Sequence, residues 1–131
     1  MEKKLIINTF SNLEKVQKIS IINFLMTLVV CDDKKEIALI RHDFLNSYNS
    51  FLELNSHENL FYLESFGQIG MIEDLKSLNK EQKELIIMLS WEILILTGQP
   101  IEIEYITLVN VFEQIGVSQD YNVQILKNVG F

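Results

Sequence analysis

The chain has 131 residues, carries a formal net charge of −7, and is 48% hydrophobic and 22% charged. This length is enough for one packed core without disulfides or metals, and the composition excludes a disordered chain. We therefore expect a single domain over residues 1–131, with residues 1–11 as an N-terminal lead-in. A chain with this net negative charge is repelled by nucleic-acid phosphates and anionic lipid. The basic clusters Lys3-Lys4 and Lys34-Lys35 have two charges each, too few to offset this repulsion.

The apolar runs are too interrupted to be membrane spans. The run from 19 to 31 contains three polar residues, and the start of the chain lacks the apolar stretch of a secretory signal. A single cysteine, Cys31, cannot form an internal disulfide and fits a reducing compartment. We expect no membrane span, a cytoplasmic location, and a buried structural role for this thiol.

Turn-forming residues are sparse, with one proline and five glycines, which argues against a β-sandwich. Gly98 and Gly116 are placed to end helices. Three pairs have the spacing of a capping box, which marks a helix start: Ser11 with Glu14, Asp33 with Glu36, and Asn79 with Gln82. These signals predict an all-α bundle of about six or seven helices. The expected helices cover 12–31, 34–53, one or two short pieces within 57–77, then 80–97, 102–115 and 119–128.

The helices at 12–31 and 80–97 are apolar around most of their second halves, so we expect them to form the buried centre. Their predicted core residues are Ile22, Leu25, Val29, Ile86, Leu89 and Ile93, with Met88 and Trp91 also in the core. The flanking helices each show one apolar stripe. The stripes are Ile37, Ile40, Phe44, Tyr48 and Phe51 in one helix, and Tyr105, Leu108, Val109 and Phe112 in the other. Phe61, Tyr62 and Phe66 extend the aromatic set. Phe61 and Tyr62 are neighbours that cannot both point the same way, so we expect one of them to line an exposed patch or a subunit contact.

A shift of 65 residues aligns the two central helices. Lys15, Gln17, Lys18, Ile21 and Ile22 then fall on Lys80, Gln82, Lys83, Ile86 and Ile87. After a gap of about three residues in the loop, Glu36 falls on Glu104, Ile40 on Leu108 and Phe44 on Phe112. This pattern predicts a bundle built from two related helix-loop-helix halves, although helices of similar burial also resemble each other without duplication.

These features resemble the TerB-like (tellurite-resistance) helical domain family, in which a buried helix, an Asp-Gly turn and a helix-opening glutamate occur twice. In the second copy, Leu78-Asn79-Lys80-Glu81-Gln82-Lys83 leads into the helix, Gly98 and Glu104 match, and Thr97 replaces aspartate. In the first copy, Asp32 and Glu36 match, and Asp33 replaces glycine. The resemblance covers roughly residues 12–128. It implies a helical, non-enzymatic module that is stress-associated and acts through protein contacts or metal response.

No motif supports catalysis. His42 and His57 are expected at the surface, and neither has the glycine pattern of a nucleophile elbow nearby. No pair of titratable groups is spaced so that each tunes the other's pKa. We therefore expect no enzymatic activity, no catalytic residue and no resident cofactor.

The acidic interhelical loops are the candidate metal site. The candidate ligands are Asp32, Asp33, Glu36 and Glu104. If these carboxylates converge, they favour Ca²⁺ or Mg²⁺, and the small number of oxygens predicts weak binding. Alternatively, they cap helices and complement helix dipoles without any metal. The leading expectation is a protein-interaction domain, as a monomer or homodimer with an unidentified protein partner. A divalent-metal-binding domain is the alternative.

Overall fold

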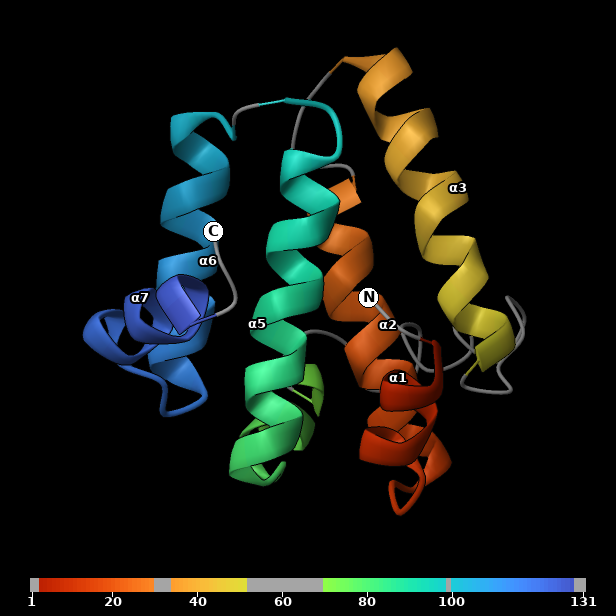
Figure 1. The fold of residues 1–131 in the computed structure, drawn as a ribbon, viewed down its shortest axis with the longest axis vertical. Helices are drawn as coiled ribbons and strands as arrows, with labels where there is room; N and C mark the ends of the chain where they lie inside the picture. The colour runs from red at the N-terminus through yellow and green to blue at the C-terminus, as the bar shows by residue number, and fades with distance from the viewer. Residues whose placement is uncertain (1–2, 30–33, 52–69, 99, 129–131) are drawn as a thin grey trace.

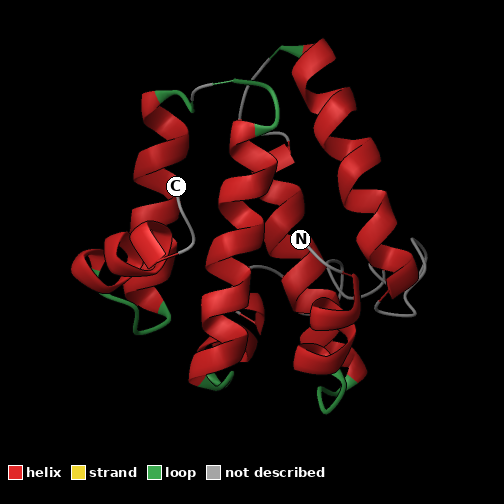
Figure 2. Ribbon diagram, viewed as in Figure 1, coloured by secondary structure: helices red, strands yellow, loops and turns green. Residues whose placement is uncertain are grey.

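The computed structural model describes residues 3–29, 34–51, 70–98 and 100–128. Over these ranges the chain is helical and contains no strand, which confirms the all-α prediction (Figure 2). The helices are α1 (Lys3–Phe10), α2 (Lys15–Val29), α3 (Lys35–Phe51), α5 (Lys80–Ile95), α6 (Glu102–Gln114) and α7 (Gln119–Asn128), and residues 70–76 are also helical. No helix within these ranges has both the length and the apolar character that crossing a bilayer requires.

Helices α2 and α5 lie side by side in the middle of the bundle (Figure 1). α3 packs against α2 on one side, and α6 stands on the other side of α5. The short helices α1 and α7 pack across the lower part of the bundle in this view, α1 against α5 and α3, and α7 against α5 and α6. The order of a central helix followed by a flanking helix therefore occurs twice.

The two central helices form the core, as their apolarity predicted. The six core positions predicted from the sequence are all buried: Ile22, Leu25, Val29, Ile86, Leu89 and Ile93. Trp91 is also buried, and Met88 is partly buried against the core. From α6, Phe112 reaches Phe24 of α2, with ring centroids 6.0 Å apart. An apolar surface around most of a helix has to be covered from several sides, and this places α2 and α5 at the centre.

Local signals fixed the start and end of α5. Asn79 and Gln82 form the predicted capping box, in which each side chain accepts a hydrogen bond from the other residue's backbone N–H at 2.9 and 3.0 Å. Gly98 and Gly116 have φ values of 116° and 91° after α5 and α6, a region that side chains disfavour.

The capping role predicted for Ser11 is wrong. α2 begins three residues later than that role requires, and the Glu14 backbone N–H donates to the Gln17 side chain at 2.9 Å. The Ser11 hydroxyl instead donates to the Asn8 carbonyl at 2.9 Å, at the end of α1. Serine hydroxyls often bond to nearby backbone carbonyls, and here this bond to Asn8 replaces the predicted helix cap.

Residues 1–11 are more than a lead-in, because they include helix α1. Ile6 and Phe10 are one helical turn apart and both are fully buried against the bundle. The side-chain amide of Gln82 donates to the Thr9 carbonyl at 3.3 Å, which links α1 to the start of α5. This short helix is therefore held by tertiary packing rather than by its intrinsic propensity.

The apolar stripe predicted for α3 does not face the core as expected. Ile40 is 51% exposed, whereas the neighbouring Arg41 is 1% exposed and Leu45 is fully buried. Ile37 and Phe44 lie at the border and are partly buried. The inward face is centred on Arg41 and Leu45, because the guanidinium finds hydrogen-bond acceptors inside the bundle. On α6, Leu108 and Phe112 are buried as predicted, while Tyr105 is 47% exposed.

The two halves differ in burial at the positions that the 65-residue shift aligns. Glu36 is exposed while Glu104 is buried, and Ile40 is exposed while Leu108 is buried. The helix order repeats, but these paired side chains occupy different environments. The predictions for Cys31, Asp32, Asp33, His57 and the aromatic side chains from Tyr48 to Phe66 lie outside the described residues.

Candidate functional site

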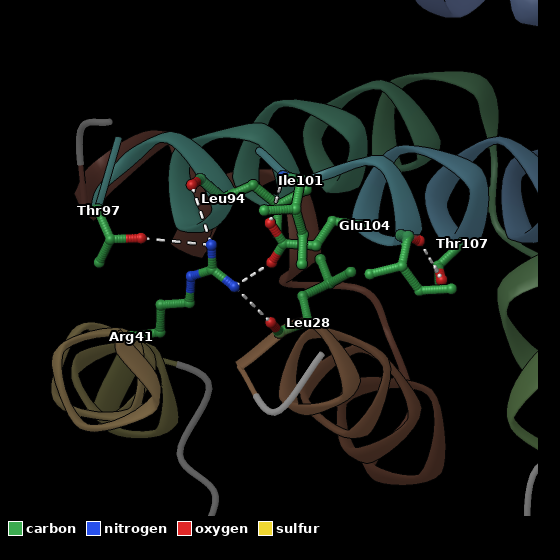
Figure 3. A network of polar contacts seen from close by, with 8 residues as sticks. Leu28, Arg41, Leu94, Thr97, Ile101, Glu104 and Thr107 are labelled. Carbon is green, nitrogen blue, oxygen red and sulfur yellow. Dashed lines mark hydrogen bonds and ion pairs between the residues drawn. The ribbon is translucent and has the colours of Figure 1, made fainter. Parts of the chain in front are cut away.

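A buried arginine on α3 connects four helices. Arg41 Nη1 donates to the Leu28 carbonyl at 3.1 Å, and Nη2 donates to the Leu94 carbonyl at 3.2 Å and the Thr97 hydroxyl at 3.3 Å. Nη1 also forms an ion pair and hydrogen bond with Glu104 Oε2 on α6 (Figure 3). The side chain therefore joins α3 to the ends of α2 and α5 and to the start of α6.

The charges at this centre complement the helix ends. Leu28 and Leu94 lie in the last turns of α2 and α5, where carbonyl groups lack partners within the helix and the dipole is negative. The Arg41 guanidinium donates hydrogen bonds to these carbonyl groups and places a positive charge at the negative ends of both helices. Its remaining polar atom, Arg41 Nε, is buried without a hydrogen-bond partner.

Glu104 acts as a cap and as a counter-ion. Its Oε1 accepts a hydrogen bond from the Ile101 backbone N–H at 3.0 Å, while Oε2 binds Arg41. Both residues of the ion pair are almost completely excluded from solvent. Both carboxylate oxygens of Glu104 are thus engaged by protein donors, and the side chain fixes the start of α6 relative to α3.

Of the four candidate metal ligands, the structure describes Glu36 and Glu104, and these two side chains lie in different environments. Glu36 is exposed in the first turn of α3, and Glu104 is buried against Arg41. Asp32 and Asp33 lie outside the described residues. Within the described ranges, no three His, Cys, Asp or Glu side chains lie together so as to hold a metal ion.

The end of α5, the connection that follows it and the first turns of α6 present apolar side chains to solvent. Of the twelve large hydrophobic side chains exposed within the described ranges, six fall in this short stretch, each between 41 and 53% exposed. They are Ile95, Leu96, Ile101, Ile103, Tyr105 and Ile106, which we name the 95–106 surface. Arg41 contacts residues within and next to this stretch, namely the Leu94 carbonyl and the Thr97 and Glu104 side chains (Figure 3). The exposed apolar residues thus lie next to the buried Arg41–Glu104 ion pair.

A second polar cluster lies where α5 meets α7. The Tyr121 hydroxyl donates to Glu84, and the Trp91 indole N–H donates to Asn122 at 3.3 Å. Partial burial of the phenol, together with its hydrogen bond to Glu84 and the charge of that carboxylate, raises the pKa of Tyr121 to about 12. This phenol therefore stays protonated at neutral pH and docks α7 on α5. The Trp91 ring also contacts Tyr105 of α6 edge-on, with centroids 5.0 Å apart.

Sequence reasoning identified Glu104 as a site residue but missed Arg41. His42, the next residue, is exposed as predicted, and its ring pairs with the Asn46 side chain at 3.3 Å. Two features of the sequence could have indicated it. Arg41 and Leu45 are one turn apart, so they share a face of α3, and Glu104 at the start of another helix could serve as the partner of the arginine. An arginine among apolar helix positions can be buried only when such a partner exists.

The described part of the chain forms an all-α helical bundle with a buried ion pair next to exposed apolar side chains at the end of α5 and the start of α6. Comparison of the chain with protein-family models, curated proteins and solved structures found no match.

Proposed function

We propose that this protein is a non-enzymatic, cytoplasmic helical module that acts by binding a protein partner through the 95–106 surface. The stress-associated role implied by the TerB-like resemblance is part of this proposal. The observation that carries it is the concentration of half-exposed apolar side chains on one short stretch. Contiguous exposed apolar residues on a folded domain mark contact surfaces, whereas single ones are ordinary.

Two further features support a contact surface at this place. Arg41 and Glu104 hold the Leu94 carbonyl and the Ile101 N–H by hydrogen bonds, so the end of α5 and the start of α6 would lose little conformational entropy on binding. The exposed aromatic Tyr105 is packed against Trp91, and aromatic side chains of this kind are common anchors in interfaces.

The test is site-specific photocrosslinking in cells of the source organism. A photoreactive amino acid is placed at Ile106 in one variant and at Ile7, a comparably exposed residue of α1, in the control. We expect discrete covalent adducts of higher mass from position 106 that are missing from position 7. Adducts of the same kind from both positions, or from neither, would contradict a binding role for this surface.

A further inference from the structure

Along the chain, the charged residues on either side of the 95–106 stretch have one sign. From residue 84 to residue 126 the sequence contains six carboxylates and no lysine, arginine or histidine. Ten of the eleven basic residues lie before this stretch. Glu104 is matched by Arg41, whereas Glu102, Glu113 and Asp120 are exposed. Helix α6 therefore carries acidic residues and no basic one, and two of its three carboxylates, those of Glu102 and Glu113, are exposed.

The outward face of α6 combines both properties. Glu102, Ile106, Val109 and Glu113 follow one another at four-, three- and four-residue steps, which places them along one line of the helix. The two carboxylates stand about 16 Å apart along the axis, at either end of the apolar pair. Ile103 lies one turn before Ile106 and is 53% exposed. A ligand on this face would meet apolar side chains between two negative charges.

We infer that the partner of this surface is a basic amphipathic helix, which lays apolar side chains on Ile103 and Ile106 and places lysine or arginine near Glu102 and Glu113. This inference rests on the proposed function and names the chemistry of its partner. A helical ligand matches a helix face, and the described residues contain no strand whose edge could pair with an extended peptide.

A second copy of the chain fits this face less well. α6 carries three glutamates and no basic residue, so any pairing of two α6 faces brings carboxylates toward carboxylates. Like charges placed opposite each other at an interface disfavour association, and opposite charges select the partner and speed the encounter. The charge pattern therefore favours a basic partner over self-association.

The test uses three fluorescent peptides of roughly 18 residues. The first is a leucine/lysine peptide with leucines at helical spacing, the second is its scrambled isomer, and the third is the matching leucine/glutamate peptide. Binding is measured by anisotropy with the full chain. We expect the first peptide to bind at least about tenfold more tightly than either of the others.

Variants separate the apolar and the charged contributions. Ile103→Gln with Ile106→Gln should weaken binding about tenfold, while the matched pair Leu5→Gln with Ile7→Gln on α1 should leave it within about twofold. All four positions are exposed, so the fold should survive, and circular dichroism of each variant checks this.

The charge variants are equally matched. Glu102→Gln with Glu113→Gln should weaken binding about three- to tenfold and flatten its dependence on salt between about 50 and about 300 mM. The control pair Glu73→Gln with Glu81→Gln removes two exposed carboxylates outside the 84–126 stretch. It should neither weaken binding nor flatten its dependence on salt.

Each adverse outcome is distinguishable. Equal binding of the scrambled or acidic peptide, or no effect of removing Glu102 and Glu113, overturns the basic-helix inference. So does a wild-type dimer in sedimentation that is lost on changing Ile103 and Ile106, since the occupant would then be a second copy. In these cases the crosslinks from position 106 would still support the proposed function, which fails only if they are missing or are matched at the control position.

Discussion

Breaking the buried pair between Arg41 and Glu104 should strongly destabilise the protein, and breaking both sides together should cost less than the sum. Arg41→Met removes the guanidinium and leaves the Glu104 carboxylate buried with only the Ile101 N–H as a donor. It also leaves the Leu28 and Leu94 carbonyls without the donors that Arg41 supplies. Removing one member of a buried ion pair costs about 3–5 kcal/mol.

Glu104→Gln tests the other side. The amide oxygen of glutamine can still accept from the Ile101 N–H, so the helix cap is kept and only the charge is lost. Arg41 is then an uncompensated buried cation, and we again expect a loss of about 3–5 kcal/mol. A domain of this kind has a total stability of about 5–15 kcal/mol, so each variant should stay folded but unfold at clearly lower denaturant.

The double variant Arg41→Met with Glu104→Gln contains neither charge. Its remaining deficit is the unsatisfied carbonyls at the ends of α2 and α5, worth about 1–3 kcal/mol. The coupling energy in the double-mutant cycle should therefore exceed about 2 kcal/mol. The assay is urea unfolding followed by far-ultraviolet circular dichroism, with the slope compared among variants so that changes in the denatured state are recognised.

Matched controls lie on the same two helices. Lys35→Met on α3 and Glu102→Gln on α6 alter exposed charges near the same ends, and each should change stability by less than about 0.5 kcal/mol. Additive single variants would show that Arg41 and Glu104 do not interact. Single losses below about 1 kcal/mol would show that Arg41 reaches solvent instead of the interior.

Three other predictions follow from the packing and the titratable groups. Leu89→Ala should cost about 2–5 kcal/mol in the same urea assay, and a loss below about 0.5 kcal/mol would show that α5 is peripheral. Because the folded pKa of Tyr121 lies above its ordinary value of 10.0, its contribution to stability is full below about pH 10 and is lost as pH rises toward 12. Stability should fall more steeply over this window in the wild type than in Tyr121→Phe, and equal slopes would show that the phenol is not linked to folding. Calcium at about 1 mM should shift the Tm of the wild type and of Glu36→Gln by the same small amount, within about 1 °C. A large shift that disappears in Glu36→Gln would establish the metal site, with Glu36 as one of its ligands.

Features that depend on neighbouring residues could be predicted from the sequence. The central position of α2 and α5 follows from apolar residues around each helix, which require burial whatever the partner is. The capping box at Asn79 and Gln82 and the positive φ of Gly98 involve only a few adjacent residues. The start and end of α5 were accordingly predicted close to where they lie.

The tertiary structure alone decided which side of α3 faces inward and what Glu104 binds. Arg41 and Glu104 are 63 residues apart, so no local periodicity relates them. An apolar stripe predicted Ile40 inside, but the hydrogen bonds available to the guanidinium at the ends of α2 and α5 placed Arg41 there and left Ile40 exposed. A buried charge is tolerated only where a partner and acceptors already stand in place, and the sequence by itself does not show where distant helices bring them together.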